Sequence, residues 1–253
     1  MIEVSGLVKR YGDREALSGV TFRVERGEIV GFLGPNGAGK TTTLRILSTF
    51  LTQDAGEAKV AGFDVLKSSM DVRRRLGYLP EQPPLDLDHT VREYLGFCAA
   101  LRGVAGKARR TAIESVVDRC GLAPVAGRLI GNLSKGYRQR VGLAQALVHE
   151  PEVVILDEPT IGLDPHQIRE IRALIRGLAG AHTVLLSSHI LPEVAMTCSR
   201  AIVVHRGRIA ADVPIDTETA GRGLEETFLR ATAADLVPEV PDTPAEPEEE
   251  VVS

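Results

Sequence analysis

Apolar residues in the first eighty positions are grouped as expected of short strands. Alternating or continuous apolar runs predict strands at residues 2–9, 20–24 and 29–33, with weaker candidates at 59–61 and 76–79. One helix is expected among them, because apolar residues recur at helical spacing from Thr42 onward. This part of the chain is therefore predicted to be β-rich.

Helical periodicity dominates residues 83–149. Thr90, followed three positions later by Glu93, forms the sequence signature of a capping box at a helix start. Two apolar stripes follow at helical spacing, the first at Val91, Tyr94, Leu95 and Cys98 and the second at Ala112, Ile113, Val116, Val117 and Cys120. We expect this segment to be all-helical and inserted between two β-containing parts.

Strands and helices alternate from residue 152 to about residue 210. The apolar run at 153–156 predicts a strand covered on both faces. Further elements are expected as a helix from Pro165 to about residue 178, strands at 183–186 and 201–204, a short helix from Leu191 and an extended segment at 208–210. Such alternation predicts a parallel sheet. Beyond residue 214 we expect one helix at 223–231 and a disordered, proline- and glutamate-rich end at 238–253.

Composition places the chain among globular proteins. Its 253 residues suffice for one large α/β domain or a domain with a sizeable insertion, and 43% of them are apolar. We expect a soluble, cytosolic protein, because no apolar run is long enough to span a bilayer and the N-terminus lacks a signal-peptide pattern. The net charge is −4, yet six acidic residues and no basic one lie in 238–253. The remainder lacks the basic excess that nucleic-acid binding requires, so no nucleic-acid partner is expected.

The strongest chemical signal is a glycine-rich loop between the strand at 29–33 and the following helix. It fits the phosphate-binding pattern G-x-x-x-x-G-K-[ST] and consists of Gly34, Pro35, Asn36, Gly37, Ala38, Gly39, Lys40, Thr41 and Thr42. Backbone N–H groups and the helix N-terminus would hold phosphate, with Lys40 on the β- and γ-phosphates and the Thr41 hydroxyl on Mg²⁺. The alternative is a glycine-rich turn before an ordinary helix, and the strand–loop–helix order favours the phosphate site.

Two adjacent carboxylates follow the apolar strand at 153–156. In P-loop nucleotide hydrolases this position holds Mg²⁺, so Asp157 is expected to bind the metal, through water. Glu158 would then face the γ-phosphate and polarise the attacking water as general base. Without the P-loop, the pair would be only a strand-to-loop boundary.

A second helix N-terminus carries a small hydroxyl residue and a glycine. Ser134 is a good N-cap and Gly136 lies in the first turn, which predicts a second anion site. One P-loop already saturates one triphosphate, so this site makes sense if it serves a nucleotide held by another molecule. Taken alone, the segment is only a capped amphipathic helix.

Together these segments resemble the ATP-binding cassette of ABC transporters over roughly residues 1–212, in the expected order. The segments that carry the resemblance are 34–42, 133–137, 153–158, 162–164 and His189. Residues 133–147 and 162–165 are more particularly similar to bacterial ABC-2-type export ATPases, including the gliding-motility and multidrug- or antibiotic-resistance groups.

The resemblance implies a P-loop hydrolase fold of α/β class with a mixed sheet. Residues 1–82 and 150–212 would form the core, with an N-terminal antiparallel β subdomain, and residues 83–149 an inserted α-helical subdomain. A short extension at 213–237 and an acidic tail at 238–253 would complete the chain, and no large C-terminal regulatory domain is expected.

The resemblance also implies roles for single residues. Tyr11 would stack on adenine, Gln82 would sense Mg²⁺ or its water, and His189 would contact the γ-phosphate. Their alternatives are a turn aromatic, a polar turn residue and a structural histidine. Ser134 and Gly136 would contact the γ-phosphate of the nucleotide on the opposite subunit. They belong to a signature segment that consists of Leu133, Ser134, Lys135, Gly136 and Tyr137. A loop across the dimer interface would consist of Gly162, Leu163 and Asp164.

Two signature positions depart from the commoner pattern. Lys135 stands where glycine is commoner and adds a cation near the partner's phosphates. Tyr137 stands where glutamine is commoner and removes an amide that could bond the ribose. Both residues are usual in the ABC-2-like groups, so the departure bears on the ribose contact and not on activity.

The implied function is ATP hydrolysis that powers export. Two copies of the chain, or one copy and a homologue, would associate head to tail around two Mg-ATP, with a homodimer as the expected form. A separate integral-membrane permease of the ABC-2 type would carry the cargo and hold the chain at the inner face of the membrane.

Other functions fit the sequence less well. A soluble ABC ATPase acting on DNA, ribosomes or protein assembly is the main rival, but residues 83–149 are too few for the coiled coil of the DNA-repair members. The ribosome-acting members carry two cassettes, and this sequence contains one. An inactive regulator is disfavoured because Lys40, Asp157, Glu158 and His189 are all present, and a small-molecule kinase would lack the signature segment.

Overall fold

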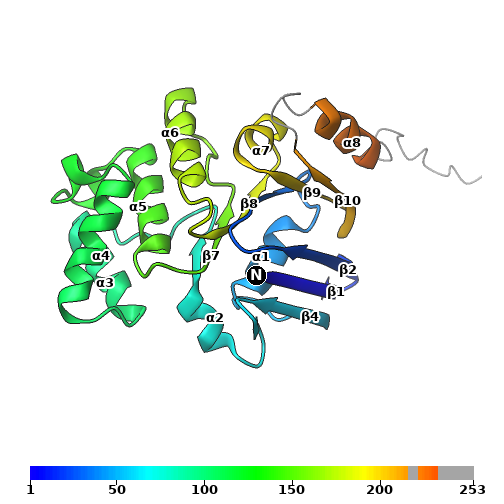
Figure 1. Cartoon of the computed structure of the whole chain (residues 1–253), viewed down its shortest axis with the longest axis horizontal. Coiled ribbons are helices and arrows are strands. Elements are labelled where there is room, and N and C mark those ends of the chain that lie inside the picture. The colour runs from blue at the N-terminus through cyan, green and yellow to red at the C-terminus, as the bar shows by residue number, and fades with distance from the viewer. Residues whose placement is uncertain (216–221, 233–253) are drawn as a thin grey trace, which may run out of the picture.

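The computed structural model describes residues 1–215 and 222–232 (Figure 1). The strands are β1 (Ile2–Tyr11), β2 (Arg14–Val24), β3 (Ile29–Leu33), β4 (Ala55–Val60), β5 (Phe63–Asp64), β6 (Leu76–Leu79), β7 (Val153–Asp157), β8 (Thr183–Ser188), β9 (Arg200–His205) and β10 (Arg208–Pro214). The helices are α1 (Lys40–Leu47), α2 (Ser69–Arg75), α3 (Val91–Leu101), α4 (Gly106–Arg119), α5 (Lys135–Leu147), α6 (Pro165–Arg176), α7 (Leu191–Thr197) and α8 (Arg222–Thr232), with 3₁₀ turns at Ala123–Val125 and Ile130–Asn132.

The N-terminal strands form an antiparallel sheet in the order β2-β1-β4-β5. Alternate residues of β1, such as Ile2 and Val4, are buried while Glu3 is exposed, as expected of a sheet with one covered face. Strand β2 begins at Arg14, six residues before the predicted start. The first half of β2 is polar and lacks the apolar pattern of a strand. It is a strand because it pairs with β1, starting with Arg14, which pairs with Tyr11 across a tight turn.

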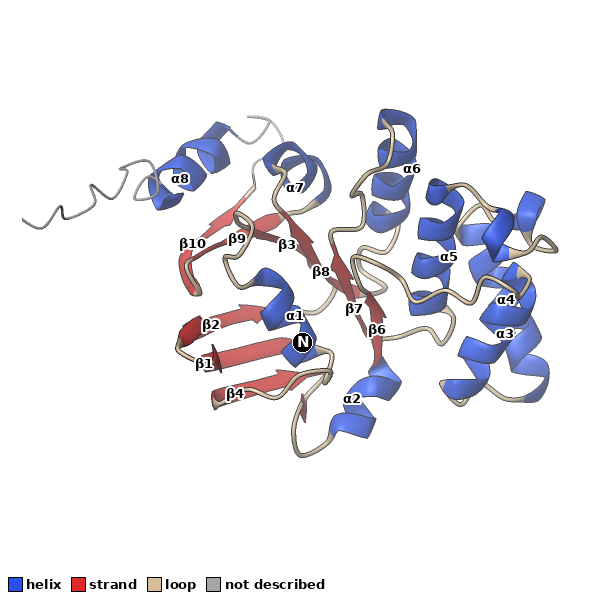
Figure 2. Cartoon of the chain, turned by 180° about the vertical axis from the view of Figure 1, so that it is seen from behind, coloured by secondary structure: helices blue, strands red, loops and turns tan. Residues whose placement is uncertain are grey.

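The larger sheet has the order β10-β9-β3-β8-β7-β6. Its neighbours are parallel except for the β9–β10 pair at the edge, so the sheet is mixed. All residues of β3, β7 and β8 are buried, in agreement with the prediction for a strand covered on both faces. Figure 2 shows the antiparallel sheet and α1 on one side of this sheet and α5, α6 and α7 on the other.

The two faces of the larger sheet belong to two separate hydrophobic cores. Val153 and Ile155 pack with the antiparallel sheet and α1, whereas Val154 and Leu156 pack with the helices on the other side. Because successive side chains of a strand point to opposite faces, one apolar run contributes to both cores. The strand β7 is thereby held firmly, with its C-terminal carboxylates at one edge of the sheet.

Helices α3, α4 and α5 lie in the connection between the parallel neighbours β6 and β7. The predicted capping box is present, since Thr90 Oγ1 accepts from the Glu93 N–H and the Glu93 carboxylate accepts from the Thr90 N–H. Residues Val91, Tyr94 and Leu95 of the first predicted stripe are buried. In Figure 1 these helices form the green part of the molecule, to one side of the sheets.

Two elements have no counterpart in the predictions, namely β5 and α2. Helix α2 is seven residues long, buries only Val72 and ends in three arginines, so its apolar periodicity is too weak to detect. The helix predicted at 223–231 is α8. The end predicted to be disordered, 238–253, lies outside the described residues. Within residues 1–215 and 222–232, each helix is too short or too polar to cross a bilayer.

Candidate active site

The phosphate-binding loop joins β3 to α1, as the sequence predicts. Gly37 and Gly39 have φ values of +78° and +104°, in the region that glycine adopts without strain. A Cβ at Gly39 would also lie 2.7 Å from the Leu17 side chain and 2.8 Å from the Ala16 carbonyl oxygen. Helix α1 begins directly after it at Lys40, which directs the first N–H groups of the helix into the loop.

Lys40 lies buried inside this loop. Its Nζ donates to the carbonyl oxygens of Gly34 at 2.7 Å and Pro35 at 3.2 Å, and lies 3.5 Å from Oε1 of Glu158. The ammonium group is thus held at the centre of the loop by three oxygen atoms. An anion entering the loop would meet a cation already in position.

Asp157 ends β7 and is anchored from two directions. Its Oδ1 accepts from Ser187 Oγ at 2.6 Å and from Thr41 Oγ1 at 3.4 Å. Burial raises the pKa of Asp157, the two hydrogen bonds lower it, and the charges of Glu158 and Glu81 raise it further. The net direction of the pKa is upward, and burial is its main cause.

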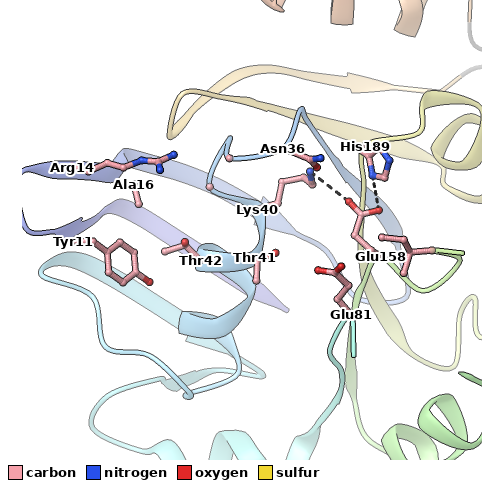
Figure 3. A pocket seen from close by; sticks show the side chains of 13 residues that line it. Tyr11, Arg14, Ala16, Asn36, Lys40, Thr41, Thr42, Glu81, Glu158 and His189 are labelled. Carbon is pink, nitrogen blue, oxygen red and sulfur yellow. Dashed lines mark hydrogen bonds and ion pairs between the residues drawn. The ribbon is translucent and has the colours of Figure 1, made fainter. Parts of the chain in front are cut away.

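Glu158 is the next residue and adopts a left-handed backbone conformation, with φ of +48°. Its N–H donates to Ser187 Oγ at 3.0 Å, so one serine of β8 holds both acidic residues. The Glu158 carboxylate lies between Lys40 and His189, whose Nδ1 is 3.0 Å from Oε2 (Figure 3). A carboxylate oriented by a neighbouring ring nitrogen has the arrangement expected of a positioned general base.

These side chains surround an open cavity of about 650 Å³, a volume suited to a nucleotide. It is lined by Tyr11, Arg14, Ala16, Asn36, Gly37, Gly39, Lys40, Thr41, Thr42, Glu81, Glu158, Ile161 and His189 (Figure 3). Nine of the predicted site residues are among them. Asp157, Gly34, Pro35 and Ala38 are not among the lining residues, although Asp157 accepts a hydrogen bond from Thr41, which is one of them.

Three residues near the cavity had no role in the sequence analysis: Arg14, Glu81 and Ser187. Glu81 lines the cavity, whereas its neighbour Gln82, the predicted metal sensor, is exposed and does not line it. Ser187 stands thirty residues from Asp157 in sequence, and only the pairing of Asp157 with Ser187 in the sheet brings them together. None of these three residues belongs to a sequence motif or to an apolar pattern that would have indicated a place at the site.

The signature segment lies elsewhere on the same chain. Ser134 caps α5 by accepting from the Tyr137 N–H, and its side chain is exposed. Lys135 extends over the next predicted loop, since a Cβ at Gly162 would lie 2.0 Å from its Nζ. Leu163 packs against the core beside the helices, and Asp164 caps α6 by accepting from two N–H groups at 2.9 Å. No residue of 133–137 or 162–164 is among the described residues that line the cavity.

The oxygen donors at the loop fit Mg²⁺. Thr41 and Asp157 offer a hydroxyl and a carboxylate within hydrogen-bond distance of each other, and this cation prefers oxygen ligands. Across residues 1–215 and 222–232, no group of three histidine, cysteine or acidic side chains could hold a metal ion.

Comparison with known proteins decides the family. Residues 17–161 match the family model described as ABC transporter. The daunorubicin resistance ATP-binding protein DrrA3 of Streptomyces coeruleorubidus is 41% identical over 234 residues, which cover 91% of this chain and 74% of that protein. The chain belongs to the ABC transporter family. Within that family it is an ATP-binding protein and an ATPase, as the sequence predicted.

Other comparisons with ABC proteins agree. The bacitracin transport ATP-binding protein BcrA of Bacillus licheniformis is 38% identical over 85% of this chain and 70% of that protein. A solved ATP-binding subunit of an ABC transporter superposes with a TM-score of 0.81 at 29% identity, covering 92% of this chain and 99% of the other. The dimeric cassette MJ0796 bound to ADP and Pi has a TM-score of 0.77 at 24% identity, covering 85% of this chain and 99% of the other, and shares the fold. The predicted α/β class with a mixed sheet and an N-terminal antiparallel sheet is confirmed.

Proposed function

We propose that this ABC protein hydrolyses Mg-ATP as a head-to-tail homodimer and powers export through a separate membrane permease of the ABC-2 type. One observation carries the dimer: the cavity contains the P-loop, Glu158 and His189, but no residue of the signature segment at 133–137, in which Ser134 and Lys135 are exposed. A second copy placed head to tail would bring its Ser134 and the start of its α5 over this cavity.

Different residues of the cavity bind the phosphates, the adenine and the metal. Lys40 and the N–H groups of the loop bind the β- and γ-phosphates, and Tyr11, which is 48% exposed at the rim, stacks on the adenine. Thr41 and Asp157 would hold Mg²⁺, which would supply positive charge to neutralise the phosphate oxygens.

Glu158 accepts a proton from the attacking water and is aimed by His189. The 3.0 Å contact between His189 Nδ1 and Glu158 fixes the carboxylate, and Lys40 keeps it close to the loop that binds the phosphates. Ser134 and the α5 N-terminus of the second copy supply hydrogen-bond donors to the γ-phosphate. They also exclude bulk water, so hydrolysis proceeds only in the closed dimer.

The relatives support the export part of this proposal. DrrA3 is named for daunorubicin resistance and BcrA for bacitracin transport, and the solved MJ0796 cassette is dimeric with ADP and Pi bound. We propose for this chain the same kind of arrangement, at the cytoplasmic face of the membrane. A soluble ATPase acting on a macromolecular assembly is the alternative, and it would lack a membrane partner.

A mixing experiment tests the shared site. Ser134→Arg blocks the signature of its own chain but leaves its P-loop intact, whereas Glu158→Gln disables its own P-loop site but offers a normal signature. Each variant alone should be nearly inactive. Mixed in equal amounts before nucleotide is added, they should recover about a quarter of wild-type ATPase activity, because half of the dimers contain one intact site out of two.

The specific ATPase activity of the wild type provides the control for this test. It should rise with protein concentration as the dimer forms. A Ser134→Arg variant that hydrolyses ATP at the wild-type rate, together with activity strictly proportional to enzyme at high dilution, would rule out the shared site.

A groove on the surface supports docking of the permease. It has a volume of about 640 Å³ and lies where α2 and the ends of α1 and α3 meet. Phe50 and Leu101 line it although they are 77% and 70% exposed, and Arg73, Arg74 and Arg102 surround them. Exposed apolar residues gathered in a groove are typical of a protein interaction site.

Substitution in this groove should uncouple the chain from its permease. Phe50→Asp combined with Leu101→Asp should reduce co-purification of the chain with a co-expressed permease by about tenfold, because it places charge in an apolar contact. The ATPase activity of the isolated chain should stay at the wild-type level. Leu229→Asp in α8, which is 53% exposed and outside the groove, is the matched control. Equal recovery of the permease by all three proteins would contradict docking at this surface.

A further inference from the structure

Glu81 lies just beyond the C-terminal end of β6, at the edge of the larger sheet. Leu79, the last residue of β6, pairs with Leu156 of β7, so the chain after β6 leaves the sheet at the edge where Asp157 and Glu158 stand. Glu81 is the second residue after β6 and lines the nucleotide cavity. Figure 3 shows its carboxylate beside Thr41 and below Glu158.

The Glu81 carboxylate is not neutralised by the protein. Glu158 has Lys40 and His189 as partners, and Asp157 has two hydroxyl donors. Within the described ranges, by contrast, the side chain of Glu81 has neither a hydrogen bond nor an ion pair, and it is exposed to the cavity. Its charge is felt by Asp157, whose pKa it helps to raise.

This charge opposes a bare triphosphate. Among the described residues that line the cavity, the cations are Arg14 and Lys40, and Lys40 already lies 3.5 Å from Glu158. A nucleotide entering without metal would bring its negatively charged phosphate oxygens close to the Glu81 carboxylate, and like charges repel each other. A divalent cation between the phosphates and the acidic residues would turn this repulsion into attraction, since Mg²⁺ binds carboxylate and phosphate oxygens together.

We propose that Glu81 is a specificity-determining residue of the nucleotide site, which excludes metal-free nucleotide and admits the triphosphate as its complex with a divalent cation. The inference rests on the proposed ATP site and goes beyond it, because it assigns the metal requirement of binding to one unpaired carboxylate. A glutamine at this position would keep the shape and the carbonyl oxygen but remove the charge. If Glu81 only binds the metal, this substitution should weaken binding in the presence of metal. If Glu81 excludes metal-free nucleotide, the substitution should strengthen binding in the absence of metal.

Isothermal titration calorimetry distinguishes these two roles of Glu81. The ligand is the imido analogue AMP-PNP, because it is not hydrolysed during the titration. Titrations are carried out in EDTA and in MgCl₂ at matched ionic strength. The wild type should bind AMP-PNP at least about tenfold more weakly in EDTA, and Glu81→Gln should gain about tenfold in EDTA, a size usual for coupling between two ligands. Affinity in MgCl₂ should change much less, and Glu81→Ala should show the same gain in EDTA.

The matched control is Glu57→Gln, which removes an exposed carboxylate of β4 outside the cavity and should leave both affinities unchanged. An unchanged affinity of Glu81→Gln in EDTA would overturn the proposal, even if binding in MgCl₂ weakened, because Glu81 would then be a metal ligand only. A wild type that binds equally well in both buffers would overturn it too, while the ATP site would stand. Absence of binding in both buffers would overturn the ATP site itself and the role of Glu81 with it.

Discussion

Glu158→Gln should lower the steady-state ATPase rate by about a hundredfold or more while ATP still binds. The glutamine side chain retains the size of Glu158 and can still accept from His189, but it cannot take a proton from water. The contacts that hold phosphate, through Lys40 and the loop N–H groups, stay in place. The rate is measured by phosphate release and binding by calorimetry.

The oligomeric state gives a second measurement for Glu158→Gln. ATP bound without hydrolysis should hold the two copies together, so the variant should elute as a dimer with Mg-ATP and as a monomer without it. Glu57→Gln, with the same chemical change on an exposed strand, should behave like the wild type. Turnover within a fewfold of the wild type would remove Glu158 from the role of base.

The sequence predicted most accurately the elements whose signal is local. The loop 34–42 was predicted because it fits the P-loop pattern, whose glycines at 37 and 39 adopt positive φ, and the strand 153–156 because it is a continuous apolar run, all of which is buried. The first half of β2 was missed because pairing with β1, rather than burial, makes it a strand. Helix α2 was missed because it buries only Val72.

The site was predicted less completely than the fold, because contacts across the sheet leave no pattern in the sequence. Gln82 and Glu81 are neighbours in an irregular segment, and nothing local indicates which of them faces the cavity. The pairing of β6 with β7 brings this segment to the edge of the sheet where Asp157 and Glu158 stand, and of the two residues it is Glu81 that lines the cavity. Ser187 is a further example, since its hydroxyl bonds Asp157 and the Glu158 N–H through the pairing of β7 with β8.

Ser187 anchors both acidic residues of the site, Asp157 and Glu158. Ser187 holds the carboxylate that would bind metal and the backbone of the residue that would act as base. A shift of β8 relative to β7 would therefore move both groups together. His189 directly follows β8 and would move with it, so β8 couples the base to its orienting partner.

Lys40→Met should weaken ATP binding by about a hundredfold, within the range usual when one partner of a buried charge pair is truncated, and should reduce hydrolysis to background. Methionine fills the buried channel of the lysine stem, so the loop should keep its shape, but the ammonium between the Gly34 carbonyl and Glu158 is lost. Glu158, Glu81 and Asp157 would then face the phosphates with Arg14 as the remaining cation among the described residues that line the cavity. Binding is measured by calorimetry with AMP-PNP in MgCl₂.

The two variants should therefore fail in different ways, and this contrast tests the assignment of the site as a whole. Glu158→Gln retains nucleotide and loses turnover, whereas Lys40→Met loses nucleotide and shows no nucleotide-dependent dimer. Lys67→Met, at a position 83% exposed beside Asp64, controls for the loss of one positive charge and should match the wild type. Wild-type affinity in Lys40→Met would show that the loop 34–42 does not hold the phosphates. The base assigned to Glu158 would then have no substrate within its reach.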